Sequence, residues 1–378
     1  MSEELDVVRQ GIDEVDRELV TLLKRRLQLV SKVGEIKSRL GIPVYAPDRE
    51  RDMLEKRRSE AEKHGISPQL IEDVLRRIMR ESYCNEHDAG FKCVNPSARN
   101  IVIIGGNGQL GSIFVRMFRL SGYQVDVLSR RNWETDAQRM LANPGMVIVC
   151  VPIDVTGETI EKLGSLPEDC ILTDFTSVKA VPLEKMLKIH RGPVMGLHPM
   201  FGPDIASMAK QVVVCCEGRY QDQCEWVLAQ MKIWGTRIER VTADEHDRAM
   251  SFIQALRHFT TYAYGYYLQK YRVDLDRLVQ LSSPIYRLEL MLVGRLFAQD
   301  PSLYADIILS SERNVENIMA YRDCIDEQVK MVQSYSRESF IREFLNIRDY
   351  FGSYSEQFLK ESKILLDQAR DSMVHNTL

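Results

Sequence analysis

The chain has 378 residues, which is too long for one ordinary hydrophobic core and predicts two or three domains. Charged residues make up 28% of it and the formal net charge is −4, so no overall charge favours nucleic acid or a membrane as a partner. No apolar run approaches the roughly 20 residues that span a bilayer, and the acidic start "MSEELDVVRQ" lacks the features of a signal peptide. The eight cysteines include no Cys-x-x-Cys pair, which disfavours disulfides and zinc. We therefore expect a cytoplasmic protein without a metal.

The first part of the chain has helical periodicity. Apolar residues recur at heptad-like spacing from Leu5 to Leu40, which predicts one helix about 50 Å long. Such a helix is longer than a small domain covers by itself, so we expect a second copy of the chain to pack against it in a homodimer. The pattern breaks at "GIPVYAPDRERD". A second helix is expected from near Asp48, and a third with Ser67 as its N-cap and Pro68 at its first position.

The character of the chain changes near residue 95. Short β-branched runs separated by helical or turn segments predict an α/β domain with a parallel sheet; the runs are "NIVIIGG", "QVDVLSR", "MVIVCVP", "CILTDF", "PVMGLHP" and "QVVVCC". From about residue 244 the periodicity is helical again. We therefore expect an all-α module (1–90), a linker (91–98), a Rossmann-type dinucleotide-binding domain (99–243) and an all-α domain for substrate binding and dimerisation (244–378).

A glycine-rich turn follows the first of these strands. Gly106-x-Gly108-x-x-Gly111 stands between the apolar run Ile101 to Ile104 and a helical segment, with Gln109 and Leu110 inside the motif. Glycines in this context let the backbone turn tightly and approach a pyrophosphate at a helix N-terminus. The turn predicts dinucleotide binding.

The second strand bears on the choice between NAD and NADP. An acidic residue normally ends this strand and binds the ribose 2′-hydroxyl, but here Ser129, Arg130 and Arg131 stand at that point, while Asp126 lies within the strand. A hydroxyl followed by two arginines suits a 2′-phosphate and favours NADP. The alternative is that both arginines are solvated surface residues.

Several polar residues are expected to form a second site. His198 lies in "GLHPMFGP" and Ser177 in "DFTSVK", both after strands, where open α/β folds bind ligands. Arg287 and Arg295 lie eight residues apart on an otherwise apolar helix and share a broad face of it. Arginine on such a helix is costly unless it meets an anion, which indicates a substrate that carries carboxylate.

From residue 99 onward the chain resembles prephenate dehydrogenases, through "GGNGQLG", "TSVK", "GLHPMFGP", "EHD", "ALRHF" and "SSPIYRLEL". The resemblance implies oxidative decarboxylation of prephenate to 4-hydroxyphenylpyruvate. It implies that His198 accepts a hydrogen bond from the ring hydroxyl, that Ser177 positions that hydroxyl, and that Arg295, with Arg287, binds carboxylate. The family usually uses NAD, so the serine and arginines at 129–131 are a departure from it. Feedback inhibition by L-tyrosine is also implied, with His258 and Tyr304 as candidate residues.

Basic residues also stand out in the long amino-terminal helix. Arg26 occupies a position that the heptad pattern would fill with an apolar residue, and Lys37, about 1100° further round the helix, lies within roughly 20° of it. These two could bind one small anion. Arg9 is about 25 Å from Arg26 along the axis, so it could reach such a site only in the partner chain. The alternative is a coiled-coil dimerisation helix whose basic residues are solvated.

The first ninety residues resemble the all-helical chorismate mutase family, through "VVRQGIDEVDRELVTLLKRRLQLVSKVGEIK", "PDRERDML" and "IMRESYCNE". The resemblance implies a pericyclic rearrangement of chorismate to prephenate, catalysed by holding the folded dianion and stabilising charge at the breaking C–O bond. The residues it implies for this site are Arg9 of the partner chain, Arg26, Lys37, Arg49, Glu50, Ser82 and Glu86.

Two positions depart from that family. Ala46 stands where some relatives have an acidic residue that contacts the substrate hydroxyl, and Glu86 stands where some have glutamine. A carboxylate cannot donate a hydrogen bond to the ether oxygen, so Glu86 must be protonated and mutase activity should fall as pH rises. A flat mutase profile between pH 5 and 8 would contradict this.

Together the two resemblances imply a bifunctional enzyme of tyrosine biosynthesis. One alternative is an NADP-dependent dehydrogenase acting on another small acid, with residues 1–90 serving only for dimerisation or regulation. Another is a nucleotide-sensing protein whose segment "LLKRRLQLVSKVGEIKSR" binds nucleic acid, but its apolar seam occupies one face and its basic residues lack interleaved aromatics.

Overall fold

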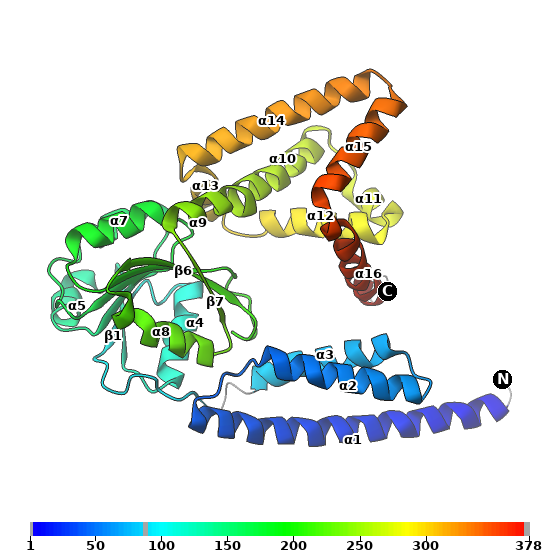
Figure 1. Ribbon diagram of the computed structural model, residues 1–378, viewed down its shortest axis with the longest axis horizontal. Coiled ribbons are helices and arrows are strands. Elements are labelled where there is room, and N and C mark those ends of the chain that lie inside the picture. Colours follow the sequence, from blue (N-terminus) through cyan, green and yellow to red (C-terminus); the bar gives the residue numbers. More distant parts are fainter. Residues whose placement is uncertain (1–2, 86–89, 374–378) are drawn as a thin grey trace. The chain divides into compact units, whose positions relative to one another are not determined.

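The fold is that of a computed structural model, which describes residues 3–85 and 90–373. The chain divides into two compact units, Met1–His246 and Asp247–Leu378, drawn in Figure 1. The first unit contains three amino-terminal helices and a seven-stranded sheet with its helices. The second unit is entirely helical within the described residues.

The amino-terminal module consists of α1 (Glu3–Leu40), α2 (Pro47–Lys63) and α3 (Pro68–Asn85). The predicted single long helix is confirmed as α1. The predicted start of the third helix is also confirmed, because Ser67 Oγ accepts a hydrogen bond from Leu70 N at 3.4 Å. Gly34 is the only described residue of α1 that is buried, so the apolar stripe of this helix faces solvent within one chain.

The sheet has the order β2-β1-β3-β4-β5-β6-β7. All neighbouring pairs are parallel except β5 and β6, which are antiparallel, so the expectation of a parallel sheet is correct for five of the six pairs. The loop 200–211 returns the chain directly from β5 to β6 without a crossover helix, and such a return gives antiparallel pairing. The strands are β1 (Ile101–Ile104), β2 (Val125–Leu128), β3 (Met146–Val149), β4 (Ile171–Asp174), β5 (Val194–Pro199), β6 (Val212–Arg219) and β7 (Arg237–Val241).

Helices cover both faces of the sheet (Figure 1). One core cluster includes Phe114 and Phe118 of α4 and Trp234 after α8, and the other includes Ile160 of α6 and Met186 of α7. Because both faces are covered, β1, β3 and β4 are buried along their whole length, which explains their continuous β-branched sequences. The helices are α4 (Gln109–Leu120), α5 (Trp133–Met140), α6 (Ile153–Glu161), α7 (Ala180–Ile189) and α8 (Gln221–Ile233).

The segment expected to be a linker is irregular, but it packs against the sheet domain. Phe91 is buried in the same core cluster as Trp234, and its backbone N–H donates to Leu120 O at 3.0 Å. Val94 N donates to Gln230 Oε1 at 3.0 Å, and Asn95 N donates to the Tyr123 hydroxyl at 3.1 Å. These contacts fix the path of the chain out of the helical module.

The second unit begins within α9 (Ala243–Met250), which is followed by a π-helical segment, η2 (Ser251–Leu256), and then by α10 (Arg257–Lys270). Six further helices complete it, in agreement with the helical periodicity of the sequence: α11 (Leu275–Leu281), α12 (Pro284–Phe297), α13 (Pro301–Leu309), α14 (Glu312–Gln333), α15 (Arg337–Phe351) and α16 (Ser353–Met373). Among the described residues, no helix combines the length and apolar character needed to cross a membrane.

Candidate active sites

The glycine-rich turn joins β1 to α4 and is tightly packed. Gly105 has φ of +83°, and a Cβ at this position would lie 2.1 Å from Cys150 O. A Cβ at Gly111 would lie 2.5 Å from Gly105 O, and Gly108 precedes α4 as its N-cap. Such a backbone admits close approach of a phosphate group to the N-terminus of α4, so the predicted residues Gly106 to Gly111 fit a dinucleotide. Gly105 is needed for the turn as well, although the fingerprint does not include it.

The end of β2 presents no carboxylate at the position typical of ribose binding. Asp126 accepts a hydrogen bond from Asn100 Nδ2 at 2.7 Å, as its place within the strand suggests. Ser129 donates both its backbone N–H and its hydroxyl to Asn132 Oδ1, each at 2.8 Å. Arg130 and Arg131 are exposed. The Ser129 hydroxyl therefore supports the turn into α5, and the two arginines follow it on the surface.

His198 is placed on β5 by the sheet register, opposite Val214 of β6, and it is 3% exposed. Its Nδ1 lies 2.8 Å from Nε2 of His246, a residue of α9. Burial, then the neighbouring His246 and Lys179, hold the pKa of His198 well below its usual 6.5. The imidazole is therefore neutral near pH 7, which is the state in which a ring nitrogen can accept a hydrogen bond.

A buried ion pair supports the end of β5. Lys179 and Asp174 form a salt bridge with both side chains fully buried, and Lys179 Nζ also donates to Leu197 O at 2.8 Å, one residue before His198. Thr176 N and Oγ1 donate to the same Asp174 oxygen, Oδ2. Among the described residues, no hydrogen bond reaches Asp174 Oδ1. Ser177 is half-buried in the loop after β4, between the residues of this network.

Sequence reasoning assigned no role to His246 or Asp174. His246 lies 48 residues from its partner, and its one signal was the "EHD" that contributed to the resemblance. Asp174 directly precedes the "FTSVK" segment. A carboxylate at the end of a buried strand, with a lysine five residues later, is a signal of a buried ion pair.

The remaining predicted residues of the dehydrogenase lie in the second unit. Arg287 and Arg295 are both on α12, half-buried and exposed respectively. His258 of α10 and Tyr304 of α13, predicted separately as residues for tyrosine regulation, are neighbours whose ring centroids lie 4.9 Å apart in an edge-to-face arrangement. Burial and the charge of Arg257 lower the pKa of His258 to about 4, and burial raises the pKa of Tyr304. Both rings are therefore neutral near pH 7.

In the amino-terminal module, the predicted residues Arg26 of α1 and Ser82 of α3 are in contact, and the predicted residue Lys37 contacts the segment after α1. Arg26 Nη1 donates to Ser82 Oγ at 2.9 Å, and Lys37 Nζ donates to Val44 O at 2.6 Å. Arg9 lies far along α1 and pairs with Asp6 at 3.6 Å. Arg49 is exposed at the start of α2. Glu86 lies outside the described residues.

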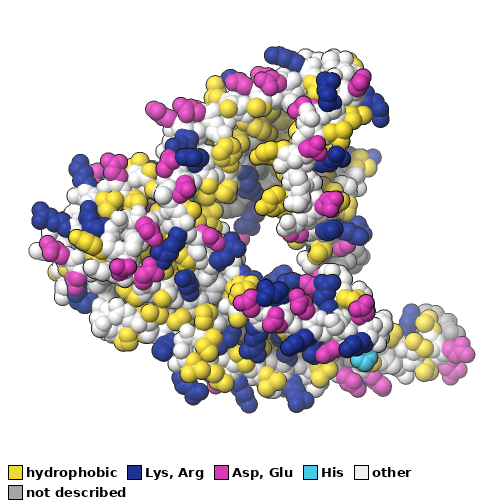
Figure 2. Space-filling view, viewed as in Figure 1, with side chains coloured by type: hydrophobic (Ala, Val, Ile, Leu, Met, Phe, Trp, Pro, Cys, Tyr) yellow, Lys and Arg dark blue, Asp and Glu magenta, His cyan; other side chains and the backbone are white. Residues whose placement is uncertain are grey.

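Like Ser82, which is 4% exposed, Glu50 is buried, with 8% of it exposed. Its Oε2 accepts from the Tyr83 hydroxyl at 2.7 Å, and its Oε1 accepts from Lys210 Nζ at 2.6 Å and from Arg76 Nη1 at 3.3 Å. Lys210 belongs to the loop between β5 and β6 and therefore to the sheet domain. Figure 2 shows Lys and Arg side chains gathered over α1–α3, interspersed with Asp and Glu.

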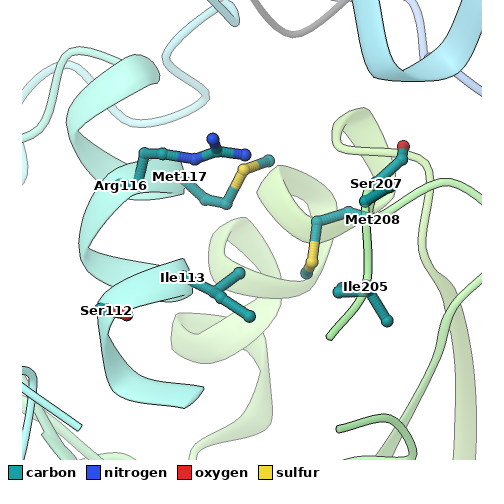
Figure 3. Close-up of a pocket in the computed structure, with 8 residues that line it drawn as sticks. Ser112, Ile113, Arg116, Met117, Ile205, Ser207 and Met208 are labelled. Atoms are coloured by element: carbon teal, nitrogen blue, oxygen red, sulfur yellow. The ribbon is translucent and has the colours of Figure 1, made fainter. Parts of the chain in front are cut away.

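A cavity of about 240 Å³ lies between α4 and the loop before β6 (Figure 3). Figure 3 shows Ile113 and Met117 of α4 pointing toward Ile205 and Met208, with Arg116 at its edge. None of the residues predicted from the sequence lines it. No group of three or more His, Cys, Asp or Glu side chains in the described ranges could hold a metal ion.

Comparison with known families gives matches to three successive parts of the chain. The family of type II chorismate mutases matches residues 8–87. The nucleotide-binding domain of prephenate dehydrogenase matches residues 128–240, and the dimerization domain of prephenate dehydrogenase matches residues 242–346.

Two curated relatives align along nearly the whole chain. The T-protein of Enterobacter agglomerans is 53% identical over 372 residues, which are 98% of this chain and 100% of the relative. The T-protein of Haemophilus influenzae is 54% identical over 370 residues, 98% of each chain. Among solved structures, an arogenate dehydrogenase from Synechocystis aligns with 68% of this chain and 99% of its own at 20% identity and a TM-score of 0.53, which shows a shared fold.

A helical mutase module, a glycine turn that fits a dinucleotide and a buried neutral histidine at a strand end thus define a bifunctional enzyme, with chorismate mutase and prephenate dehydrogenase on one polypeptide. The sequence of this chain places it in a particular family of such enzymes. It belongs to the T-protein family.

Proposed function

We propose that the chain converts chorismate to prephenate in its amino-terminal module and then oxidises prephenate to 4-hydroxyphenylpyruvate in its dehydrogenase domains, at the residues named below. The observation that carries the residue assignment is the neutral, buried imidazole of His198 at the carboxyl edge of the sheet that also carries the glycine turn. In open α/β folds this edge is where ligands bind.

For the mutase reaction we assign Arg26, Lys37 and Arg49 to the carboxylates and ether oxygen of chorismate. Arg26 and Lys37 are both half-buried on α1, and Ser82 Oγ orients the guanidinium of Arg26. No covalent intermediate is needed, because the rearrangement is pericyclic. These cations hold the folded dianion and stabilise the charge that develops as the C–O bond breaks. Glu50 and the undescribed Glu86 complete the proposed site.

The proposed homodimer follows from α1. Its apolar residues are widely exposed in one chain; Val8 is 60% exposed, Ile12 56% and Leu22 60%. A stripe of this kind is stabilised by packing against a second helix. A partner chain along α1 would also bring its own Arg9 toward the site of the first chain. The match of residues 242–346 to a dimerization domain also supports a homodimer.

For the dehydrogenase reaction we assign His198 as the acceptor of a hydrogen bond from the substrate hydroxyl. The nicotinamide, when bound, accepts the hydride from the carbon that carries this hydroxyl. Nδ1 of His198 faces His246, so Nε2 is the nitrogen that we assign to the substrate. The ring carboxylate leaves as carbon dioxide, and the electrons of its C–C bond complete the aromatic ring. Ser177 positions the hydroxyl, and Arg295, with Arg287, binds substrate carboxylate.

We propose NAD as the preferred hydride acceptor. The Ser129 hydroxyl, which would otherwise favour a 2′-phosphate, is already donated to Asn132. Arg130 and Arg131 are exposed and leave room for NADP as a weaker alternative. We also propose a cytoplasmic location, from the scattered spacing of the eight cysteines in the sequence.

We also propose that L-tyrosine is a feedback inhibitor and that His258 and Tyr304 mediate its effect. The support is their proximity, because two residues 46 positions apart present neighbouring neutral rings on α10 and α13. A ring pair of this kind can contact an aromatic ligand edge to face.

The test supplies chorismate, without prephenate, to the purified chain and follows nicotinamide reduction with NAD and with NADP in parallel. Reduction is expected in both, faster with NAD, and it should disappear in His198→Asn while chorismate consumption continues. No reduction with either chorismate or added prephenate would contradict the proposed function.

A further inference from the structure

Lys210 is a residue of the sheet domain whose side chain forms a salt bridge with the mutase module. It lies in the loop between β5 and β6, and its backbone has φ of +68°, which is uncommon for a residue with a Cβ. Its backbone N–H donates to Gly235 O at 3.0 Å, which holds the loop in this conformation. The side chain extends to Glu50 of α2, 160 residues earlier in the sequence.

The ammonium group of Lys210 contacts several groups of the mutase module, although 42% of the side chain stays exposed. Nζ lies 2.6 Å from Glu50 Oε1, 5.1 Å from the centroid of the Tyr45 ring and 5.7 Å from that of the Tyr83 ring. The two rings are edge to face, and the Tyr83 hydroxyl donates to the other oxygen of Glu50. A carboxylate and two aromatic faces attract a cation, so these three groups form a binding site for the Lys210 ammonium.

Glu50 depends on such partners because of its burial. A carboxylate with only 8% exposure is costly unless cations and hydrogen-bond donors compensate its charge. Two cations do so here, Arg76 from its own module and Lys210 from the sheet domain, and Lys210 is the nearer, at 2.6 Å against 3.3 Å.

Two further contacts join the same parts of the chain. Ser207, three residues before Lys210 and on the rim of the cavity in Figure 3, donates its hydroxyl to Tyr83 O at 3.5 Å. Val44 N donates to Ile233 O at 3.1 Å, while Val44 O accepts from Lys37 Nζ. Two of the proposed mutase residues, Lys37 and Glu50, are therefore held by groups that themselves contact the sheet domain.

We propose that Lys210 is a positioning residue for the chorismate mutase reaction, although it lies in the nucleotide-binding domain of the dehydrogenase. This rests on the proposed role of Glu50 in the mutase site. Chorismate is a dianion, so an uncompensated carboxylate beside it would repel it. Lys210 offsets that charge and fixes the direction of the Glu50 carboxylate within the proposed site.

The test compares Lys210→Met with Lys210→Arg in the full-length chain and measures both activities. In Lys210→Met we expect KM for chorismate to rise about 10-fold or more, since a charge-assisted hydrogen bond to a buried group is lost. The kcat/KM for prephenate oxidation should stay within about twofold of wild type, because a charge-assisted contact acts only on the groups it touches. Lys210→Arg should recover most of the mutase loss. Lys232→Met, which changes an exposed lysine of α8, is the matched control and should alter neither activity.

A second variant links the effect to Glu50. In a Glu50→Gln background the amide carries no charge for Lys210 to offset, so adding Lys210→Met should change KM for chorismate much less than it does alone. If Lys210→Met does not fold, Lys210→Gln, which keeps a donor and removes the charge, takes its place with the same expected direction.

The outcomes separate this inference from the proposed function. A wild-type chain without mutase activity would contradict the proposed function itself. An active wild type in which Lys210→Met leaves KM for chorismate unchanged would overturn the role of Lys210. So would a loss of both activities in parallel with a lower melting temperature, because that would show a general structural role.

Discussion

Nδ1 of His198 lies 2.8 Å from Nε2 of His246, and the two rings meet edge to face at 5.1 Å between centroids. One of these nitrogens must donate and the other accept. If Nε2 of His198 accepts the substrate hydroxyl, its proton is on Nδ1, which then donates to His246. The histidine on α9 thereby selects the tautomer of the histidine on β5.

His246 should therefore affect dehydrogenase turnover without contacting the substrate. In His246→Leu, which removes the acceptor, we expect kcat for prephenate oxidation to fall about 10-fold or more, because a buried Nδ1–H is left without its partner. His246→Gln, whose amide reaches about as far as Nε2, should retain most of the activity. Mutase activity serves as the internal control, and an equal loss in the Leu and Gln variants would contradict the tautomer role.

The lowered pKa of His198 predicts an acid-sensitive stability. In the unfolded chain this histidine takes up a proton near pH 6.5, whereas in the folded chain burial, His246 and Lys179 keep it neutral to much lower pH. The unfolded state therefore binds more protons between these two values, so the free energy of unfolding falls as pH drops below about 6.5. In His198→Asn this part of the loss should vanish. Urea unfolding of both proteins from pH 8 to 5 measures the difference, and parallel curves would refute the prediction.

Arg130 and Arg131 are expected to set the residual use of NADP. Replacing both with alanine should lower kcat/KM for NADP about 10-fold, since a 2′-phosphate loses its charged partners, while kcat/KM for NAD changes little. Arg139→Ala, on the exposed side of α5, is a suitable control. Steady-state kinetics with NAD and with NADP measures both values of kcat/KM. An equal loss with NAD and NADP would show that the two arginines act on something common to both.

The pair His258 and Tyr304 is expected to control tyrosine inhibition. In His258→Ala the concentration of L-tyrosine that halves dehydrogenase activity should rise about 10-fold, because an edge-to-face contact and a hydrogen-bonding group are lost together. Tyr304→Phe, which keeps the ring, should have a smaller effect. Inhibition curves at fixed prephenate provide the measurement, and unchanged curves for His258→Ala would remove this residue from the regulatory site.

Elements with a regular local pattern were predictable from the sequence. The long helix α1 follows from its repeated apolar residues, and the start of α3 follows from Ser67 and Pro68, because these signals act within a few residues. The turn at Gly106 to Gly111 was predictable for the same reason. The direction of β6 was not, since a strand of β-branched residues pairs equally well in either direction and the loop before it decides.

The parts of the sites that escaped prediction depend on contacts between distant residues. The pairs His198–His246 and Glu50–Lys210 span 48 and 160 residues, and neither residue of either pair carries a local sign of its partner. Helical periodicity placed Arg26 and Lys37 on one face of α1, but it could not show that Ser82 and Val44 would accept their hydrogen bonds. Such partners are determined by tertiary packing, which a single sequence does not display.

The burial of Phe91 and Val44 bears on how this protein can be divided. Both side chains are part of the same core cluster as Trp234, although one follows the mutase module and the other lies between α1 and α2. Phe91 stays with the dehydrogenase if the polypeptide is divided after α3, but Val44 leaves with the mutase module. Separating the two parts would therefore remove one apolar side chain from this core cluster and expose apolar surface on both fragments.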